Sequence, residues 1–326
     1  MTPAELSLTV HHAVRRAVEE GVLEAPVPES GSIKLERPRP GGHGDYATGI
    51  ALRLAKAAAQ EPRRVAEMLR DRIARESGIE RVDITGPGFL NITLGGGTQQ
   101  MLVRTVRERG RTYGSGDSLA GTSVRFRIEG DRRAALWTSA VSHLLSTQGA
   151  RTDVIAGGET VLRVVPAPDQ DFYERLGPDA ARWAVLSAAA HDRPRTGDEW
   201  LVQHERNPLF RVQYAYSRTR ALTRAAARLG MAAAPEEHVD APALTAAVRD
   251  YPAVTADAAR LRAPDRIARH LDVTSDAFLA FQHTVLPVGD EKPSAAHRSR
   301  LALAEAAGTV LAGGLSLLGI SAPEHL

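Results

Sequence analysis

The sequence contains no cysteine and only three lysines among its 326 residues. Without cysteine, the chain can form neither a disulfide bond nor a thiolate metal site. The lysines are Lys34, Lys56 and Lys292, so no catalytic motif that needs a lysine can lie between residues 57 and 291. The eleven histidines are scattered, and none has metal-ligand spacing near a carboxylate cluster. We therefore expect no metal site and no cofactor.

The composition is that of an ordinary soluble globular protein, with 43% hydrophobic and 25% charged residues. The chain is long enough for two or three domains. No stretch approaches the roughly 18 consecutive apolar residues of a membrane span. The first 18 residues carry charges and lack a signal-peptide core, so we expect a cytoplasmic protein without membrane contact.

The basic residues are almost all arginine, because 38 of the 41 basic side chains remain after the three lysines. Arginine binds phosphate through a planar fork and stacks on bases, which suits nucleic-acid binding. A GC-rich genome would produce the same bias, and the many alanines agree with that reading. The net charge of +2 also excludes a surface that is basic all over. The arginine content alone therefore decides nothing.

The first hundred residues carry alternating helix and strand signals. Thr2-Pro3-Ala4-Glu5 forms a capping box before a row of apolar residues spaced by four, Asp45 can cap a second helix, and Pro62 can open a third. The triplet at 95–97, which is all glycine, is expected to end this α/β unit. We expect helices over 2–18, 45–56 and 62–75, and strands over 32–35, 82–84 and 89–94.

A second segment, from 123 to about 198, begins with an alternating strand at Val124 and Phe126. A helix over 132–145 and further strands at 154–155 and 161–165 are expected after it. From Asn207 onward, helical periodicity runs almost to the end of the chain. The expected helices there are 208–229, 241–262, 264–284 and 294–318. The fold class is therefore α/β, followed by an all-α helical bundle.

Several motifs resemble those of arginyl-tRNA synthetases. They are GDYAT at 44–48, GPGFLN at 86–91, NPLFRVQYAYSR at 207–218 and LLGISAPEHL at 317–326. In this order they resemble the N-terminal additional domain, the start of the DALR-type anticodon-binding domain and the C-terminus of that family. The chain departs from the family at Gly49, where Asn is usual, at Tyr216, where His is common, and at His325-Leu326, where Arg-Met is usual.

This resemblance implies three parts, of which the middle one is unusual. Residues 1–115 resemble the N-terminal additional α/β domain, and residues 201–326 resemble the DALR-type helical domain. Residues 116–200 resemble a small, truncated remnant of the class I catalytic domain. Gly130 to Ala150 can be laid over the helix that begins at the HIGH signature, but the chain has no His-x-Gly-His.

The space left for a nucleotide-binding sheet is small. Only about 25 residues separate Ala150 from the run at 176–183, which resembles the segment after the KMSKS loop. A doubly wound nucleotide-binding domain needs roughly 100 residues or more. We therefore expect no aminoacylation activity and no enzyme.

The resemblance and the helical spacing both indicate RNA-contacting residues. In the family, the G-F-x-N turn contacts the tRNA D-loop, which would make Phe89 a stacking residue and Asn91 a reader of a base edge; core and turn roles are equally open to them. At 100° per residue, Arg211, Tyr214 and Arg218 share one strip of the helix at 208–229. Cations beside an aromatic ring suit a flexible RNA loop.

Other arginines are weaker candidates. By the family resemblance, Arg266 and Arg269, with Arg262, lie on helices that line the anticodon pocket. A further row, Arg220, Arg224 and Arg228, steps by four on another face of the helix at 208–229 and is expected to be solvated.

We expect a non-catalytic tRNA-binding protein, with an arginine-type tRNA as partner. One alternative is a protein-interaction module that pairs with a synthetase or another protein. Another is an accessory of an enzyme that uses charged tRNA as an aminoacyl donor. The sequence shows no nucleophile or base arranged for such a transfer.

Overall fold

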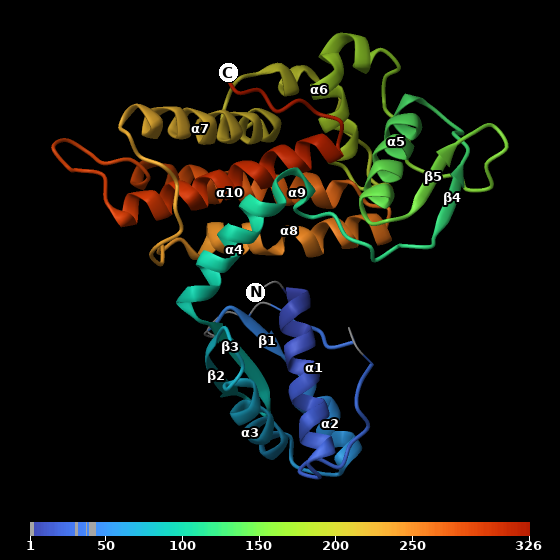
Figure 1. Cartoon of the computed structure of the whole chain (residues 1–326). Coiled ribbons are helices and arrows are strands. Elements are labelled where there is room, and N and C mark those ends of the chain that lie inside the picture. Colours follow the sequence, from blue (N-terminus) through green and yellow to red (C-terminus); the bar gives the residue numbers. More distant parts are fainter. Residues whose placement is uncertain (1–2, 30–31, 37, 39–43) are drawn as a thin grey trace. The chain divides into compact units, whose positions relative to one another are not determined.

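The computed structural model describes residues 3–29, 32–36, 38 and 44–326 (Figure 1). The chain divides into two compact units, Met1–Leu102 and Val103–Leu326, and helix α4 (Gly96–Arg109) includes the boundary. The second unit contains both the segment expected at 116–200 and the helical segment expected at 201–326. No helix within the described ranges is long and apolar enough to cross a membrane.

The first unit is an antiparallel three-stranded sheet that shares one core with three helices. The strand order is β1-β3-β2, with Tyr46 opposite Ile92 and Val82 opposite the same residue. The four-residue spacing of Leu6, Val10 and Val14 places these side chains on one buried face of the first helix. The elements are α1 (Pro3–Glu19), β1 (Tyr46–Thr48), α2 (Ile50–Ala58), α3 (Pro62–Ile73), β2 (Ile79–Thr85) and β3 (Phe89–Leu94).

Some expectations for this unit are wrong. Residues 32–35 form no strand, and only Glu36 makes a bridge there, to Ala47. Asp45 does not cap a helix; its carboxylate accepts a hydrogen bond from the Leu94 amide at 2.9 Å. The three residues after Asp45 form β1 instead, because pairing with β3 satisfies their backbone groups. Thr2, the expected cap of α1, lies outside the described residues.

The second unit begins with a parallel pair of strands, β4 (Ser123–Phe126) and β5 (Arg151–Val154), joined by α5 (Arg132–Thr147). The expected helix at 132–145 is confirmed. The strand expected at 161–165 is absent, and only Thr160 makes a bridge there, to Phe126. Helix α6 (Phe172–Leu186) follows and is kinked at Gly177, where φ is 75°.

Four long helices complete the second unit, and all four expected helices are confirmed within a few residues. Asn207 caps the first of them, since its side chain accepts from the amides of Leu209 and Phe210, and Ser294 caps the last. Figure 1 shows α10 lying among α7, α8 and α9. The helices are α7 (Pro208–Arg228), α8 (Pro242–Arg260), α9 (Asp265–Phe281) and α10 (Ala295–Leu317); short 3-10 turns are η1 (Gly110–Thr112), η2 (Asp198–Leu201) and η3 (Gln282–Thr284).

Helix α10 approaches its neighbours through glycines. A Cβ atom at Gly308 would lie 2.6 Å from Thr219 Oγ1 on α7. A Cβ atom at Gly314 would lie 2.6 Å from Leu271 Cδ2 on α9. The three helices can therefore pack this closely because glycine has no side chain at these two positions.

Candidate nucleic-acid interface

The strip expected on α7 is partly exposed and carries two aromatic rings. Tyr214 is 37% exposed. Its ring stacks on the half-buried ring of Phe210, with centroids 5.8 Å apart and planes inclined by 19°. Because the two residues are one helical turn apart, their rings form a continuous platform on the helix surface. Such a platform can accept an unstacked base.

Arg211, at one end of the strip, is neutralised. Its guanidinium forms ion pairs with Asp272 and Asp276 of α9, the second at 3.2 Å, and donates to the Glu205 carbonyl at 3.1 Å. The side chain is only 23% exposed. The expectation of a cation free to bind phosphate is therefore not met at Arg211. The two carboxylates come from another helix, which no single-helix pattern can show.

The charge of Arg218, one turn beyond Tyr214, is not compensated by an ion pair within the described residues. Its Nε donates to Gln282 Oε1 at 2.9 Å, a neutral partner. Among the described residues, no carboxylate is paired with this guanidinium. The strip therefore consists of the Phe210–Tyr214 rings with one uncompensated cation beside them.

The arginine candidates on α9 and just before it differ from one another. Arg266 is exposed, whereas Arg269 forms an ion pair with the buried carboxylate of Asp265. Arg262 has a left-handed backbone with φ of 53°, and its guanidinium lies 5.9 Å from the Phe126 ring. Only Arg266 is therefore placed as a free surface cation would be.

The two candidate residues of the first unit, Phe89 and Asn91, lie on the hairpin formed by β2 and β3. Asn91 is only 3% exposed, and its amide donates to Thr85 Oγ1 across the hairpin at 2.9 Å. This is the arrangement of a residue that orders a turn, so Asn91 is not placed to read a base. Phe89 is half-buried, and a Cβ atom at Gly49 would lie 3.4 Å from its ring.

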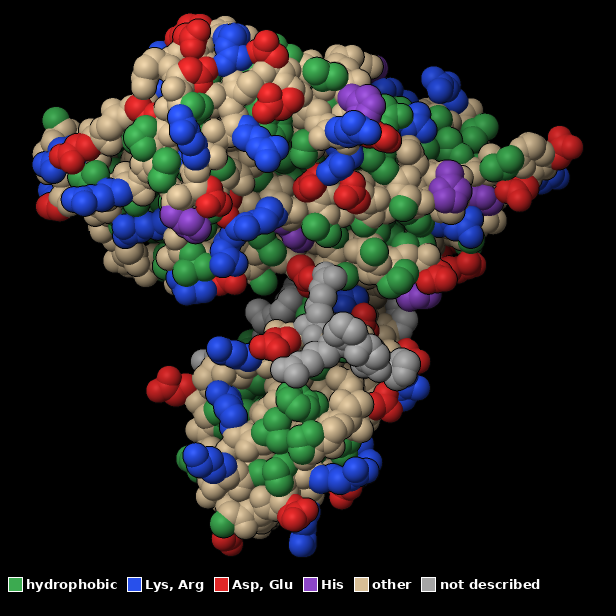
Figure 2. Space-filling model, turned by 180° about the vertical axis from the view of Figure 1, so that it is seen from behind, with side chains coloured by type: hydrophobic (Ala, Val, Ile, Leu, Met, Phe, Trp, Pro, Cys, Tyr) green, Lys and Arg blue, Asp and Glu red, His purple; other side chains and the backbone are tan. Residues whose placement is uncertain are grey.

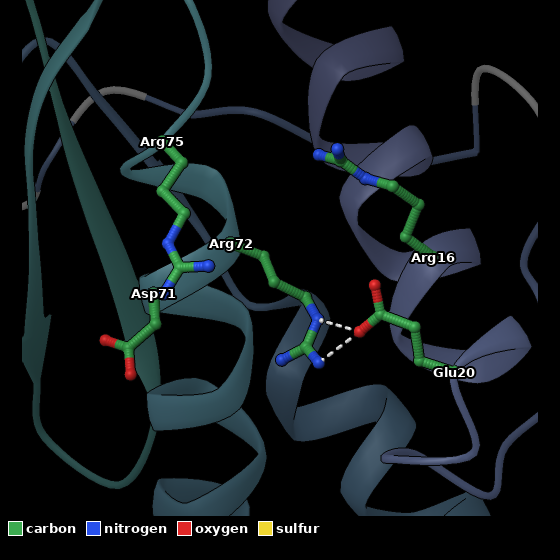
Figure 3. A pocket seen from close by; sticks show the side chains of 5 residues that line it. All are labelled: Arg16, Glu20, Asp71, Arg72 and Arg75. Carbon is green, nitrogen blue, oxygen red and sulfur yellow. Dashed lines mark hydrogen bonds and ion pairs between the residues drawn. The ribbon is translucent and has the colours of Figure 1, made fainter.

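A small pocket of about 240 Å³ in the first unit was not foreseen from the sequence (Figure 3). Arg16 and Glu20 of α1 line it, with Asp71 and Arg72 of α3 and Arg75 just after it. The hydrogen bonds from Arg72, one of them from Nε at 3.2 Å, hold the pKa of the Glu20 carboxyl below its usual value. These residues come from two helices, and only the fold brings them together.

The face that Figure 2 shows carries no single basic patch among the described residues. Arginine and lysine side chains are interspersed there with aspartate and glutamate on each unit. The net charge of +2 likewise gives no overall basic field for a nucleic acid.

The N-terminus of α5 is the place where a βαβ unit would bind a phosphate, because the helix amides point outward there. It is occupied by the chain itself. Asp131 accepts from the Ala134 amide at 3.1 Å with one carboxylate oxygen and from the Ala167 amide at 2.8 Å with the other. An anionic ligand at this end would meet a resident negative charge.

Arg133, two residues later, is fully buried. Its guanidinium donates to five backbone carbonyls, and burial lowers its pKa. It thus binds the segments after α5 and α6 rather than a ligand. The acceptors are the carbonyls of Val165, Val185, Ala188, Ala189 and Asp192. No group of three or more His, Asp or Glu side chains in the described part of the chain could hold a metal ion.

Two protein-family models match the chain. The Arginyl tRNA synthetase N terminal domain matches residues 7–94, and the DALR anticodon binding domain matches residues 212–326. The first contains the hairpin with Phe89 and Asn91, and the second contains Tyr214, Arg218 and the four long helices apart from the first turn of α7.

The similar relatives are arginine–tRNA ligases. The ligase of Frankia alni is 47% identical over 128 residues, which are 39% of this chain and 23% of that ligase. The ligase of Pseudarthrobacter chlorophenolicus is 24% identical over 561 positions that cover both chains completely. Since this chain has 326 residues, about two fifths of those positions lie opposite a gap.

The fold resembles that of a solved structure, Thermus thermophilus arginyl-tRNA synthetase. The TM-score is 0.70 at 14% identity, and the comparison covers 100% of both chains. At this identity the likeness concerns the fold alone.

Proposed function

We propose that this chain is a cytoplasmic tRNA-binding protein without aminoacylation activity. The proposal is based on its likeness to arginyl-tRNA synthetases, whose N-terminal and DALR anticodon-binding domains it has. The chain spans 23% of the Frankia alni ligase that it matches, so the activity of that whole ligase is not carried over. The tRNA binding and the lack of aminoacylation are both proposed for this chain alone. The partner that the resemblance favours is an arginine-type tRNA.

The observation that carries the RNA-binding part is the exposed Tyr214 ring beside the uncompensated charge of Arg218. Both lie within the stretch that matches the anticodon-binding family. A base stacked on such a ring gains roughly 1–3 kcal/mol, and the guanidinium can bind the neighbouring phosphate. A single-stranded loop offers both groups together, whereas duplex DNA keeps its bases stacked.

Three features support the absence of aminoacylation. The middle segment has two parallel strands where a doubly wound nucleotide fold has a larger sheet. At the helix end that would face a phosphate, the Asp131 carboxylate takes the amides. Amino-acid activation needs cations around the ATP phosphates, and the nearest lysines in the sequence are Lys56 and Lys292.

The direct test of RNA binding is a filter-binding comparison of arginine tRNA with duplex DNA of similar length. We expect tighter binding of the tRNA, and Arg218→Ala should weaken it about tenfold, since a hydrogen bond to a charged group contributes about 1.5 kcal/mol. Arg228→Ala is the matched control, because Arg228 is exposed on the same helix but outside the strip. Equal affinity for both nucleic acids, unaltered by Arg218→Ala, would contradict the proposal.

Two further measurements complete the test. Competition by other tRNAs shows whether the arginine type is preferred. Incubation with arginine, ATP and arginine tRNA should produce no charged tRNA. Turnover in this assay would refute the non-catalytic part without affecting the binding part.

A protein-interaction module remains a second candidate because of two specific residues. Arg211 is neutralised by α9 and Asn91 is buried in its hairpin, so two expected RNA contacts are engaged within the protein. A protein partner that co-purifies after ribonuclease treatment, together with no tRNA affinity, would favour this candidate.

A further inference from the structure

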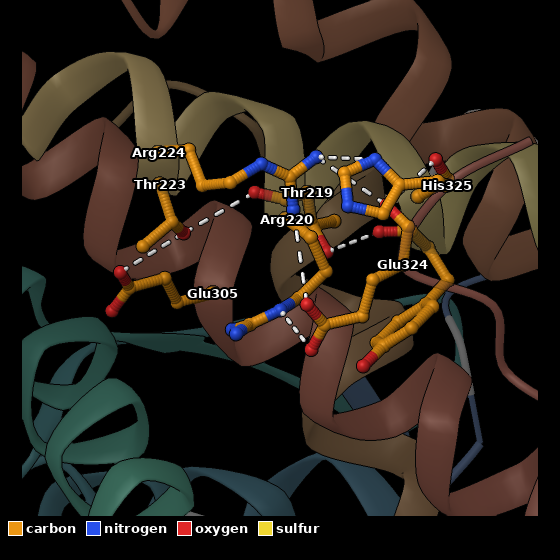
Figure 4. A network of polar contacts seen from close by, with 9 residues as sticks. Thr219, Arg220, Thr223, Arg224, Glu305, Glu324 and His325 are labelled. Carbon is orange, nitrogen blue, oxygen red and sulfur yellow. Dashed lines mark hydrogen bonds and ion pairs between the residues drawn. The ribbon is translucent and has the colours of Figure 1, made fainter.

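The C-terminal segment lies along one face of α7 (Figure 4). Gln213 donates to the Ser321 carbonyl at 3.1 Å, and Ser217 donates to the Glu324 carbonyl at 3.2 Å. Arg224 donates to the same Glu324 carbonyl at 3.3 Å. The α7 residues in these contacts are spaced by four and seven, so they lie on one stripe of the helix.

Within this stripe, two arginines share one carboxylate. Arg220 Nε lies 3.1 Å from one oxygen of Glu324, and Arg224 Nη1 lies 3.8 Å from the other. The arginines are four residues apart, so they repel each other unless an anion lies between them. Glu324 is that anion in the isolated chain.

All three side chains remain open to solvent. The exposed fractions are 42% for Arg220, 39% for Arg224 and 50% for Glu324. Exposed ion pairs contribute little net stability, so the carboxylate is exchangeable. A backbone phosphate is, like the carboxylate, a monoanion with two charged oxygens, and planar guanidinium groups bind it bidentately, so it can take the place of the carboxylate.

A groove of about 1070 Å³ within the second unit adjoins the pair. It is lined by η1 and by parts of α4, α5, α6, α7, α8, α10 and the C-terminal segment. Its arginines and carboxylates balance in number, so the groove carries no net charge of its own. The charged residues in question are Arg107, Arg111 and Arg220 against Asp179, Glu305 and Glu324.

We propose that Arg220 and Arg224 form a binding site for a backbone phosphate of RNA, and that Glu324 occupies this site while no RNA is bound. The proposal rests on the proposed tRNA binding. At 100° per residue, Arg218 points to another side of α7 than the pair, and the C-terminal segment over Ser217 lies between them. The two sites are therefore separate.

The test is the affinity of the full chain for arginine tRNA, measured by fluorescence anisotropy over a series of salt concentrations. Glu324→Gln keeps the shape of the side chain and removes its charge. We expect binding to become roughly two- to fivefold tighter. The plot of log affinity against log salt should keep about the slope of the wild type, because the same phosphate contact forms in both proteins.

Glu305→Gln is the matched control. Glu305 lines the same groove, but it accepts a hydrogen bond from Thr223 and pairs with neither arginine. This variant should bind like the wild type. In an Arg220→Gln, Arg224→Gln background, Glu324→Gln should have no effect, and the salt slope should be shallower than that of the wild type.

Two results would overturn the site while tRNA binding stands: Glu324→Gln with the affinity of the wild type, or a gain that persists without the two arginines. Thermal melting of each variant confirms that it is folded. If the wild type does not distinguish tRNA from duplex DNA, the proposed function itself fails, and the two failures are thereby separated.

Discussion

Replacement of Arg133 by methionine should lower the free energy of unfolding of the second unit more than replacement of an exposed arginine does. Arg133 has no exposed surface and lies on α5, where its guanidinium donates to five carbonyls. Its distances to the carbonyls of Ala189 and Asp192 are both 2.8 Å. Methionine fills part of the space and supplies no donor.

The magnitude follows from the acceptors left behind. Of the five carbonyls, the one of Ala189 also accepts from the Asp192 amide, so it keeps a partner. Each of the others loses the donor that the structure gives it, and a buried carbonyl without a partner costs about 1–3 kcal/mol. Relaxation and entering water recover part of this. We expect a loss of about 3–5 kcal/mol in the free energy of unfolding.

Urea denaturation at pH 7 measures this loss, with Arg132→Met as the control. Arg132 is the adjacent residue, but it is 43% exposed and pairs with Glu174, so its replacement should cost less than about 1 kcal/mol. If the two variants have unfolding free energies within 1 kcal/mol of each other, Arg133 does not hold the segments after α5 and α6 together.

Three further predictions concern stability. Gly114→Ala should destabilise the second unit by about 2–3 kcal/mol in urea, since φ is 99° and a Cβ atom would lie 2.6 Å from the buried Tyr251 ring. Gly88→Ala should lower the urea midpoint of the first unit, because its Cβ atom would lie 2.9 Å from a backbone oxygen at the start of α3. The hydroxyl of Thr196, with Arg175, holds the pKa of Asp169 below its usual value, so Thr196→Val should raise that pKa. A lowered pKa stabilises the fold above the pKa of the unfolded chain, so the loss in Thr196→Val should be present at pH 7, shrink as pH falls below the ordinary aspartate pKa of 3.8, and vanish only below the lowered pKa of the folded protein in urea midpoints.

Much of the fold could be predicted from local signals. The cap at Asn207 followed by Pro208 marks the start of α7, and the periodicity of the last 120 or so residues gives four helices. By contrast, α4 begins in a glycine triplet, which carries no helix signal, and it is stabilised by burial of Leu102 and Val106. Asp45 looks like a cap until β3 is known to lie beside it.

The candidate site divides in the same way. Helical spacing places Arg211, Tyr214 and Arg218 on one strip, as the structure has them. What spacing cannot give is the partner from another helix, so the charge of Arg211 could not be known to be cancelled by Asp272 and Asp276. Contacts with residues distant in the sequence decide which arginine charges are compensated by a carboxylate.

The glycines of α10 have a consequence for the opposite side of the bundle. At both glycines the backbone of α10 lies against a side chain of a neighbouring helix, Thr219 of α7 or Leu271 of α9. Added bulk at Gly308 or Gly314 would have to displace that side chain, and with it α7 or α9. The alignment of the Tyr214 ring and Arg218 with Gln282 would shift with it, although neither glycine comes near a ligand. Evolutionary selection for RNA recognition would then also act on Gly308 and Gly314, which lie away from the binding surface.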